Sequence, residues 1–390
     1  MANQTRQLAG LLRAEGCSVE LVRQNRPYVP AWIGAFPRVR ALARLLSYLR
    51  SLWGAAGRVE VVHVMANSGW SWHLFAAPAI VIGRLRGAAV VVNYRGGRAE
   101  QFFDRSYWLV APVLRLAGAV VVPSGFLHEV FRRRGVSAQV VPNIVDCARF
   151  RLGAEVADAP VGETRGAHLI VARNLESIYD NATAVRAFRI VKDHVPDARM
   201  TIAGTGPEEA KLEVLVESLE LSGSVTFVGR VDNDRMPELY RSADVAINPS
   251  LIDNMPNSVL EALASGVPVV STDVGGVPYL VKHDRTALLV PPCAPERMAH
   301  AVLRLVRERG LAERLSEAGR RLAEEYTWER SREKLFTVYT QVLEEAGSKS
   351  AAYGTCTHRR VSPRRSSQPD NSRRAGSPDP KRKKRRGDSE

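Results

Sequence analysis

Short apolar runs rich in β-branched residues alternate with amphipathic segments along most of the chain. The runs lie at 18–22, 60–64, 88–93, 119–122 and 139–141, and again at 168–171, 199–203, 225–228, 244–248, 268–271 and 287–290. Segments with the helical spacing of apolar residues fit between them. Strands that are apolar throughout and alternate with helices predict parallel sheets covered on both faces. We therefore predict an α/β fold with two doubly wound, Rossmann-like domains.

The two series of strands meet at a segment that lacks this pattern. Residues Phe150–Gly166 are rich in Ala, Gly, Asp and Pro and predict a linker. The predicted organisation is an N-terminal domain at 1–150, a C-terminal domain at 151–327, a helix at 328–346 that crosses back, and a disordered basic tail at 347–390.

The N-terminal domain begins unusually. The spacing of Leu8, Leu11 and Leu12 predicts a helix over Asn3–Glu15, before the run at 18–22. A doubly wound domain normally begins with a strand and a Gly-rich turn. We therefore expect either that this domain lacks its first strand or that the true start lies upstream.

The basic excess does not indicate a nucleic-acid-binding protein. The chain carries 55 Lys and Arg against 41 Asp and Glu, but 13 and 4 of these, respectively, fall within 347–390. Most of the excess therefore belongs to the tail, and we expect no nucleic-acid partner. Its basic run at 381–386 could alternatively resemble a nucleic-acid or nuclear-import patch, but a solvated or read-through extension is the preferred interpretation.

Cysteine spacing and hydropathy exclude further classes. The four cysteines show no CxxC pair, which argues against a zinc ribbon or a disulfide scaffold. No uninterrupted apolar run reaches the about 18 residues of a membrane span. No cluster has convincing metal-ligand spacing. We expect a cytoplasmic protein without a metal or other cofactor.

Glycine-rich turns follow several predicted strands. They are Gly204-Thr-Gly206, Gly275-Gly276 and Arg95-Gly96-Gly97. Ligands of open parallel sheets bind at the carboxyl ends of strands, where glycines let the backbone approach a phosphate. Each turn alone is more simply a tight turn, but several at one edge favour a nucleotide cleft.

Charged residues occur at the same strand ends. Arg173 follows the first strand of the second domain and could clamp a diphosphate. Asp253 lies in a loop, and Glu261 lies in the helix that follows, where carboxylates can accept hydrogen bonds from sugar hydroxyls. Taken singly, a surface arginine, a helix cap and a solvated helical glutamate are the simpler interpretations.

The stretch Val171–Pro292 resembles the retaining glycosyltransferases of family 4, the group 1 transferases of GT-B fold. The matching motifs include Ile202–Pro207, Asn248–Ser250, Glu261–Val270 and Gly275–Pro278. The resemblance implies that Glu261 holds the ribose of a nucleotide-diphosphate sugar, and that Asp253 lies near the donor sugar. The implied catalytic residues are Arg173 and Asp253, and the implied donor-binding residues are Gly204, Gly206, Arg230, Asn254, Met255, Pro256 and Glu261. Arg95, Gly96 and Gly97 are expected on the N-terminal side of the cleft.

The sequence departs from the family pattern at two charged positions. Tyr179 stands near the place of the family's second diphosphate-binding cation, a lysine, and Arg95 stands where a histidine is common. The expected function is sugar transfer, with retention, to a polysaccharide or lipid-linked acceptor. The alternatives are a homologue that binds nucleotide without turnover, and a GT-B nucleotide-sugar epimerase or phosphorylase.

A basic amphipathic segment at 38–53 adds a further expectation. Its leucines and Trp53 fall on one side and Arg44 and Arg50 elsewhere, a pattern that suits either an anionic membrane surface or a core-facing helix. Peripheral contact with the inner face of the membrane would fit a lipid-linked acceptor.

Overall fold

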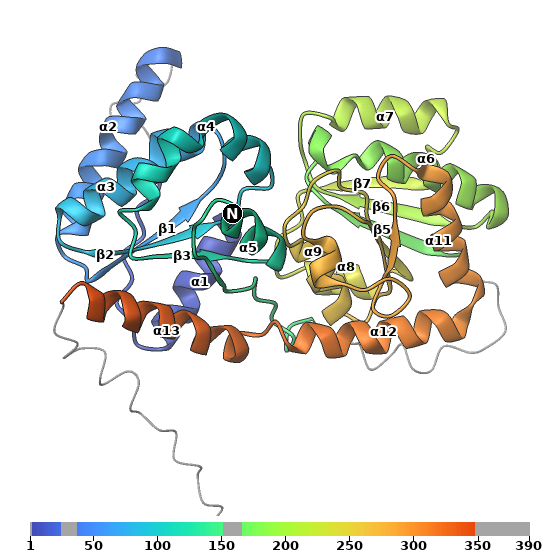
Figure 1. Ribbon diagram of the computed structural model, residues 1–390. Helices are drawn as coiled ribbons and strands as arrows, with labels where there is room; N and C mark the ends of the chain where they lie inside the picture. Colours follow the sequence, from blue (N-terminus) through green and yellow to red (C-terminus); the bar gives the residue numbers. More distant parts are fainter. Residues whose placement is uncertain (1, 25–36, 151–165, 348–390) are drawn as a thin grey trace, which may run out of the picture.

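The protein contains two parallel sheets that lie side by side, each covered by helices (Figure 1). The computed structural model describes residues 2–24, 37–150 and 166–347. The predicted linker and the basic tail lie almost entirely outside these ranges, so the predicted domain limits stay predictions.

The N-terminal sheet has four parallel strands in the order β1-β2-β3-β4. Its strands are β1 (Val61–Ala66), β2 (Ala89–Tyr94), β3 (Ala119–Val122) and β4 (Gln139–Val140). Its helices are α1 (Ala2–Ala14), α2 (Pro37–Ala56), the π-helical turn η2 (Trp72–Ala76), α3 (Ala77–Leu85), α4 (Ala99–Leu114) and α5 (Gly125–Arg132).

The strand predicted at 18–22 is wrong, because this segment pairs with no strand. Its Val19 and Val22 are partly buried against the core, which explains the strand-like pattern of the sequence. The Val19 carbonyl oxygen accepts a hydrogen bond from Arg13 Nη2 at 2.7 Å instead of joining a ladder. The expectation that this domain lacks a first strand stays a prediction.

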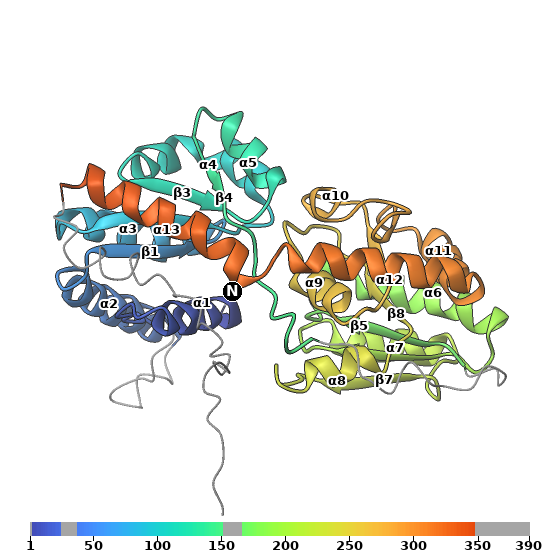
Figure 2. The same ribbon diagram turned by 90° about the horizontal axis from the view of Figure 1, so that it is seen from below.

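Side chains of β2 alternate between the two layers of the N-terminal domain. Val90 and Val92 pack with helices α2 to α5, whereas Ala89 and Val91 pack with α1 and α13 (Trp328–Glu345). Helix α13 runs along the N-terminal sheet although the chain reaches it from the C-terminal domain (Figure 2). Helix α13 covers nearly the whole of the segment 328–346 that the sequence analysis predicted as a helix.

Helix α2 divides its apolar residues between the core and the surface. Leu45, Leu49 and Leu52 pack inward, while Leu46 and Trp53 are about half exposed. Much of the predicted apolar side therefore faces the core; the side chains of residues 38–42 lie outside the described part. Among the described residues, no helix combines the length and apolar character needed to cross a bilayer.

The C-terminal sheet has six parallel strands in the order β10-β9-β8-β5-β6-β7, the arrangement of a dinucleotide-binding fold. Its strands are β5 (His168–Ala172), β6 (Arg199–Ala203), β7 (Val225–Gly229), β8 (Val245–Asn248), β9 (Val269–Thr272) and β10 (Leu288–Val290). Its helices are the 3-10 turn η4 (Ser177–Tyr179), α6 (Asn181–His194), α7 (Glu209–Ser218), α8 (Met236–Arg241), α9 (Asn257–Ala264), α10 (Val277–Leu280), α11 (Pro295–Arg307) and α12 (Arg309–Glu324).

Strand order places the ligand edge of this domain. β5 pairs with β6 on one side and with β8 on the other. The strands after β5 therefore extend the sheet first in one direction, through β6 and β7, and then in the other, from β8 to β10. Ligands of doubly wound sheets bind beside the carboxyl ends of the strands at such a point. The segments that follow β5 and β8 contain Arg173 and Asp253, respectively.

Candidate functional site

A cleft of about 1700 Å³ lies between the two domains. It is lined from the C-terminal domain by Arg173, Gly204, Arg230, Asp253 and Glu261, and from the N-terminal domain by Arg95, Gly97 and α1. Asn254, Met255 and Pro256 also line it, whereas Gly96 and Gly206 are not among the lining residues. The fold thus collects at one cleft most of the residues that the sequence predicted.

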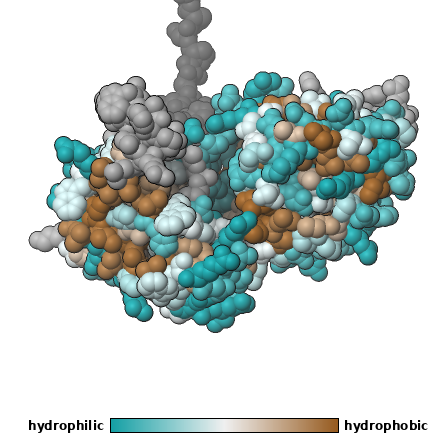
Figure 3. All heavy atoms as spheres, turned by 90° about the horizontal axis from the view of Figure 1, so that it is seen from above, coloured by the Kyte–Doolittle hydropathy of each residue, from teal (hydrophilic) through white to brown (hydrophobic). Residues whose placement is uncertain are grey.

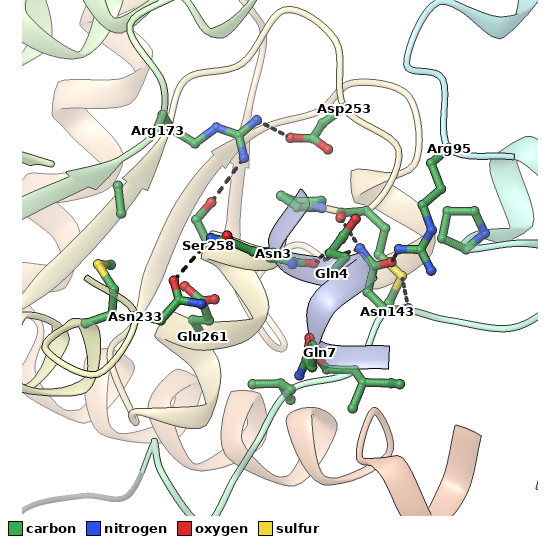
Figure 4. A pocket seen from close by; sticks show the side chains of 18 of the residues that line it. Asn3, Gln4, Gln7, Arg95, Asn143, Arg173, Asn233, Asp253, Ser258 and Glu261 are labelled. Carbon is green, nitrogen blue, oxygen red and sulfur yellow. Dashed lines mark hydrogen bonds and ion pairs between the residues drawn. The ribbon is translucent and has the colours of Figure 1, made fainter. Parts of the chain in front are cut away.

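Arg173 is held by three neighbours (Figure 4). Its Nη2 donates to Asp253 Oδ2 at 2.5 Å and its Nη1 donates to Ser258 Oγ at 3.2 Å. The guanidinium also lies 4.0 Å from the centre of the Tyr179 ring, which stacks against its face. The tyrosine that replaces the expected lysine therefore orients the arginine instead of adding a second charge.

One donor of the Arg173 side chain is left over. Its Nε is buried and finds no hydrogen-bond partner among the described residues. The amide oxygen of Asn254, on the same wall of the cleft, is likewise buried without a partner among the described residues. An unsatisfied buried polar group costs about 1–3 kcal/mol, so both atoms suit a polar ligand.

Glu261 lies in the first turns of α9 and faces the same cleft. Burial raises the pKa of its carboxyl group to about 7, although the hydrogen bond from Tyr240 and the charges of Arg149 and Arg173 act in the opposite direction. The hydroxyl of the buried Tyr240 lies 3.3 Å from Glu261 Oε2. The carboxyl group is therefore oriented by a neighbour and poised between its two charge states near neutral pH.

The glycine turns pack loops together. A Cβ on Gly204, whose φ is +155°, would lie 1.9 Å from the Arg173 carbonyl oxygen, and one on Gly206 would lie 2.3 Å from that of Leu175. A Cβ on Gly276 would lie 1.7 Å from the Asn254 carbonyl oxygen. These glycines let neighbouring backbones approach the arginine and the loop at 252–256, which we call the donor loop.

Arg95 begins the loop after β2, and its side chain forms hydrogen bonds to two asparagines. Its Nε donates to Asn93 Oδ1 at 3.0 Å and its Nη1 donates to Asn143 Oδ1. Beside it, a Cβ on Gly96 would meet Ser68 Oγ at 2.1 Å, and one on Gly97 would meet Ile252 Cγ2 at 3.1 Å. The Arg95–Gly97 loop thus abuts the donor loop.

Sequence reasoning missed several residues of the cleft. Ser258 binds Arg173, Tyr240 binds Glu261, and Asn143 and Asn257 join the two domains. Asn257 and Ser258 are the first two residues of the helix that contains Glu261, which was a usable signal. Asn143 belongs to the segment Val141–Asp146, which resembles the family only weakly, and nothing in the sequence singled out Tyr240. Among the described residues, no three His, Cys, Asp or Glu side chains are placed to hold a metal ion.

Both halves of the chain match models of known glycosyltransferase families. Residues 1–149 match the model described as Glycosyltransferase Family 4, and residues 165–322 match the one described as Glycosyl transferases group 1.

Two relatives illustrate the sequence similarity. An uncharacterized glycosyltransferase of Methanocaldococcus jannaschii is 33% identical over 160 residues, which cover 41% of this chain and 40% of that protein. The D-inositol 3-phosphate glycosyltransferase of Salinispora arenicola is 27% identical over 330 residues, or 78% of this chain and 73% of that protein.

The fold also matches solved structures. Sucrose-phosphate synthase from Thermosynechococcus elongatus superposes with a TM-score of 0.70 at 20% identity and covers 87% of this chain and 93% of its own. Anabaena HepE, solved in complex with UDP and glucose, superposes with a TM-score of 0.64 at 15% identity and covers 75% and 81%. These neighbours share the GT-B architecture of two facing α/β domains. From the family models of both domains and this fold, the chain belongs to the group 1 glycosyltransferases of family 4.

Proposed function

We propose that this protein transfers a sugar from a nucleotide-diphosphate sugar to a glycan or lipid-linked acceptor, with retention of configuration at the anomeric carbon. The donor would lie against the C-terminal domain and the acceptor against the N-terminal domain. Retention rests on the resemblance to the retaining transferases of family 4.

The observation that carries the proposal is the cluster at the carboxyl ends of β5 and β8. There, a guanidinium fixed by Asp253, Ser258 and Tyr179 keeps a buried Nε donor without a partner among the described residues. A diphosphate supplies anionic oxygens for such a donor. A preorganised cation that meets the departing diphosphate stabilises the charge that develops in the transition state.

The other donor contacts follow from position. In its ionised form Glu261 offers two oxygens to the hydroxyls of a ribose, and Tyr240 keeps its carboxyl group oriented. The Asn254 side chain and the backbone at Met255 and Pro256 would face the sugar. Arg230 lines the same cleft and is exposed, so its guanidinium is accessible to the nucleotide. We propose no metal or other cofactor.

The wall of the cleft on the N-terminal domain, where the acceptor would lie, is mainly basic. Among the lining residues from the N-terminal domain, Arg6, Arg95, Arg98 and Arg149 stand against one carboxylate, Asp146. An acceptor that carries a phosphate fits this wall, and the Salinispora relative is named for such a compound.

We also propose a cytoplasmic enzyme with peripheral membrane contact through the N-terminal domain. Trp70 and Trp108 are more than 70% exposed, and Leu46 and Trp53 are exposed on the neighbouring α2. From above, apolar side chains gather on this domain (Figure 3). Exposed arginines near them, among them Arg50, Arg84 and Arg105, would face anionic lipid headgroups.

The test is a panel of UDP-, GDP- and ADP-sugars, assayed for binding, for hydrolysis and for transfer to glycan and phosphate-bearing acceptors. Binding of one donor class with transfer that retains anomeric configuration is expected. Epimerised donor or sugar phosphate as the product would point to an epimerase or phosphorylase, and binding without turnover would point to an inactive homologue. No binding of any donor would overturn the donor-site proposal.

A further inference from the structure

A chain of polar side chains crosses the N-terminal domain from α13 to the cleft. It begins at the Tyr339 hydroxyl, which lies 2.8 Å from His63 Nδ1 on β1. His63 Nε2 lies 3.1 Å from Asn93 Nδ2 on β2. Burial, together with the charge of Arg95, lowers the pKa of His63 to about 3, so the ring is neutral and its Nε2 accepts from the asparagine. The orientation of Asn93 is thereby fixed.

Arg95 continues the chain toward the C-terminal domain. The oriented Asn93 presents its Oδ1 to Arg95 Nε at 3.0 Å, and Arg95 Nη1 donates to Asn143 Oδ1. Burial lowers the pKa of Arg95 to about 10, which leaves it charged at neutral pH. Within the described chain no carboxylate lies within ion-pair distance of this guanidinium. A buried cation needs hydrogen bonds to offset lost hydration, and here neutral amides provide them.

The last links reach the donor loop and the start of α9. Asn143 Nδ2 donates to the Met255 carbonyl oxygen at 2.8 Å and to Asn257 Oδ1 at 2.7 Å. In the opposite direction, Asn254 Nδ2 donates to the Arg95 carbonyl oxygen at 3.0 Å. Figure 4 shows Arg95 and Asn143 turned toward each other on the N-terminal side of the cleft.

The polarity of these bonds leaves Asn143 one orientation. Its Oδ1 must face the arginine, which only donates, so its Nδ2 must face the carbonyl oxygen of Met255. Without Arg95, the amide could turn over and place an oxygen against that carbonyl. The arginine therefore controls the donor loop through a residue that contacts it.

We propose that Arg95 and Asn143 are positioning residues that set the donor loop from the opposite domain. The donor site is then complete only while the two domains are in contact, and separation of the domains releases the loop. This inference rests on the proposed function for its effect on catalysis. Arg95, which the sequence analysis placed on the N-terminal side of the cleft, acts here through Asn143.

The first test needs no ligand. Hydrogen–deuterium exchange of the full chain is compared for wild type, Asn143→Ala and the matched control Gln139→Ala. The Gln139 side chain joins β4 to α13 by a hydrogen bond to Gln341 at 3.2 Å, but Gln139 is not among the residues that line the cleft. We expect at least tenfold faster exchange of backbone amides within 252–260 in Asn143→Ala, and no change in Gln139→Ala. Unchanged exchange in Asn143→Ala would overturn the proposal.

The second test measures UDP affinity and kcat. Asn143→Ala should weaken UDP binding and lower kcat, each by about tenfold, and Arg95→Lys should give a smaller loss because it keeps the charge but not both bonds. Combining Asn143→Ala with Asn254→Ala should give clearly less than the product of the single effects, since both release one loop. The proposal would be contradicted if folded Asn143→Ala kept a UDP affinity and a kcat within twofold of wild type, or if the effects of the two substitutions were fully additive.

The two tests separate this proposal from the proposed function. If wild type binds no nucleotide but Asn143→Ala loosens 252–260, the positioning role stands and the transferase proposal fails. If Asn143→Ala does not fold, Asn143→Asp replaces it, because the carboxylate keeps the acceptor for Arg95 and removes the donor to Met255. Unchanged exchange in that variant would equally overturn the proposal.

Discussion

The two domains use the same parallel-sheet architecture but expose different surfaces. Among the described residues, eight of the exposed large apolar side chains belong to the N-terminal domain and three to the C-terminal domain. On the cleft, the N-terminal wall contributes four arginines and one carboxylate, Asp146, whereas the C-terminal wall combines Arg173 and Arg230 with Glu176, Asp253 and Glu261. The proposed donor side therefore carries charges of both signs, and the proposed acceptor side is mainly basic and belongs to the domain with more exposed apolar side chains.

The two walls also differ in how they are assembled. On the donor side, Asp253, Ser258 and Glu261 come from one loop and one helix, and Arg173 follows a neighbouring strand. On the acceptor side, α1, the loops after β1 and β2, and Asn143 come from distant segments. A local site can be recognised by its spacing, whereas a wall made from many segments depends on their packing.

Replacing one arginine on each wall by alanine should give the largest difference between the two walls. Arg173→Ala should lower kcat/KM by on the order of 10² to 10³-fold, because it removes the preorganised cation at the diphosphate. Arg98→Ala should change kcat/KM less than tenfold and act on the KM for the acceptor. Steady-state kinetics with both substrates varied would measure this, and equal losses in both variants would contradict the division of roles.

Gly276 and Gly97 both pack against the donor loop, and replacing each by alanine should have different effects. Gly276→Ala forces a Cβ to within 1.7 Å of the backbone oxygen of Asn254, whereas Gly97→Ala meets a side-chain methyl of Ile252 at 3.1 Å. We expect Gly276→Ala to cost about 1–3 kcal/mol of unfolding free energy and to weaken UDP binding strongly. Gly97→Ala should do neither. Thermal unfolding and calorimetric titration would check both, and comparable effects would refute this packing argument.

The pH dependence of donor affinity tests the proposed contact between Glu261 and the ribose. With a pKa of about 7 the carboxyl group is mostly protonated at pH 6 and mostly ionised at pH 8, and only the ionised form offers both oxygens to a ribose. UDP-glucose affinity should rise by about tenfold across this range.

Two variants control this measurement. Glu261→Gln should bind weakly at every pH, and Glu261→Ala should lose at least tenfold in affinity at pH 8. UDP-glucose is a better probe than UDP, because UDP has a terminal phosphate that itself titrates at about pH 6. A flat profile for wild type would refute the ribose role.

The smallest expected effect concerns the apolar surface of the N-terminal domain. Replacing Trp70 and Trp108 together by Ser should lower binding to vesicles that contain anionic lipid by about three- to tenfold, with little change in stability, because both side chains are exposed. Val214→Ser on the C-terminal domain is the matched control. Vesicle sedimentation at low salt measures the difference. Equal binding by all three proteins would exclude the proposed contact.

Most of the fold could be predicted from periodicity. The runs at 119–122 and 199–203 coincide with β3 and β6, and the helix predicted at 328–346 overlaps α13. The segment at 18–22 was misassigned because its valines pack against the core without a neighbouring strand to pair with. In α2, spacing alone could not show that Leu49 faces the core while Leu46 faces solvent.

The two α/β domains and the residues at the strand ends of the C-terminal domain could be predicted from the sequence, because side-chain periodicity and strand ends are local properties. The contacts of the charged groups could be found only in the folded protein. Tyr179 stacks on Arg173, Tyr240 orients Glu261, and Arg95 is directed through Asn143 to the donor loop. These roles depend on which distant segments meet at the cleft, and burial there sets both the charge states and the hydrogen bonds that remain for a ligand.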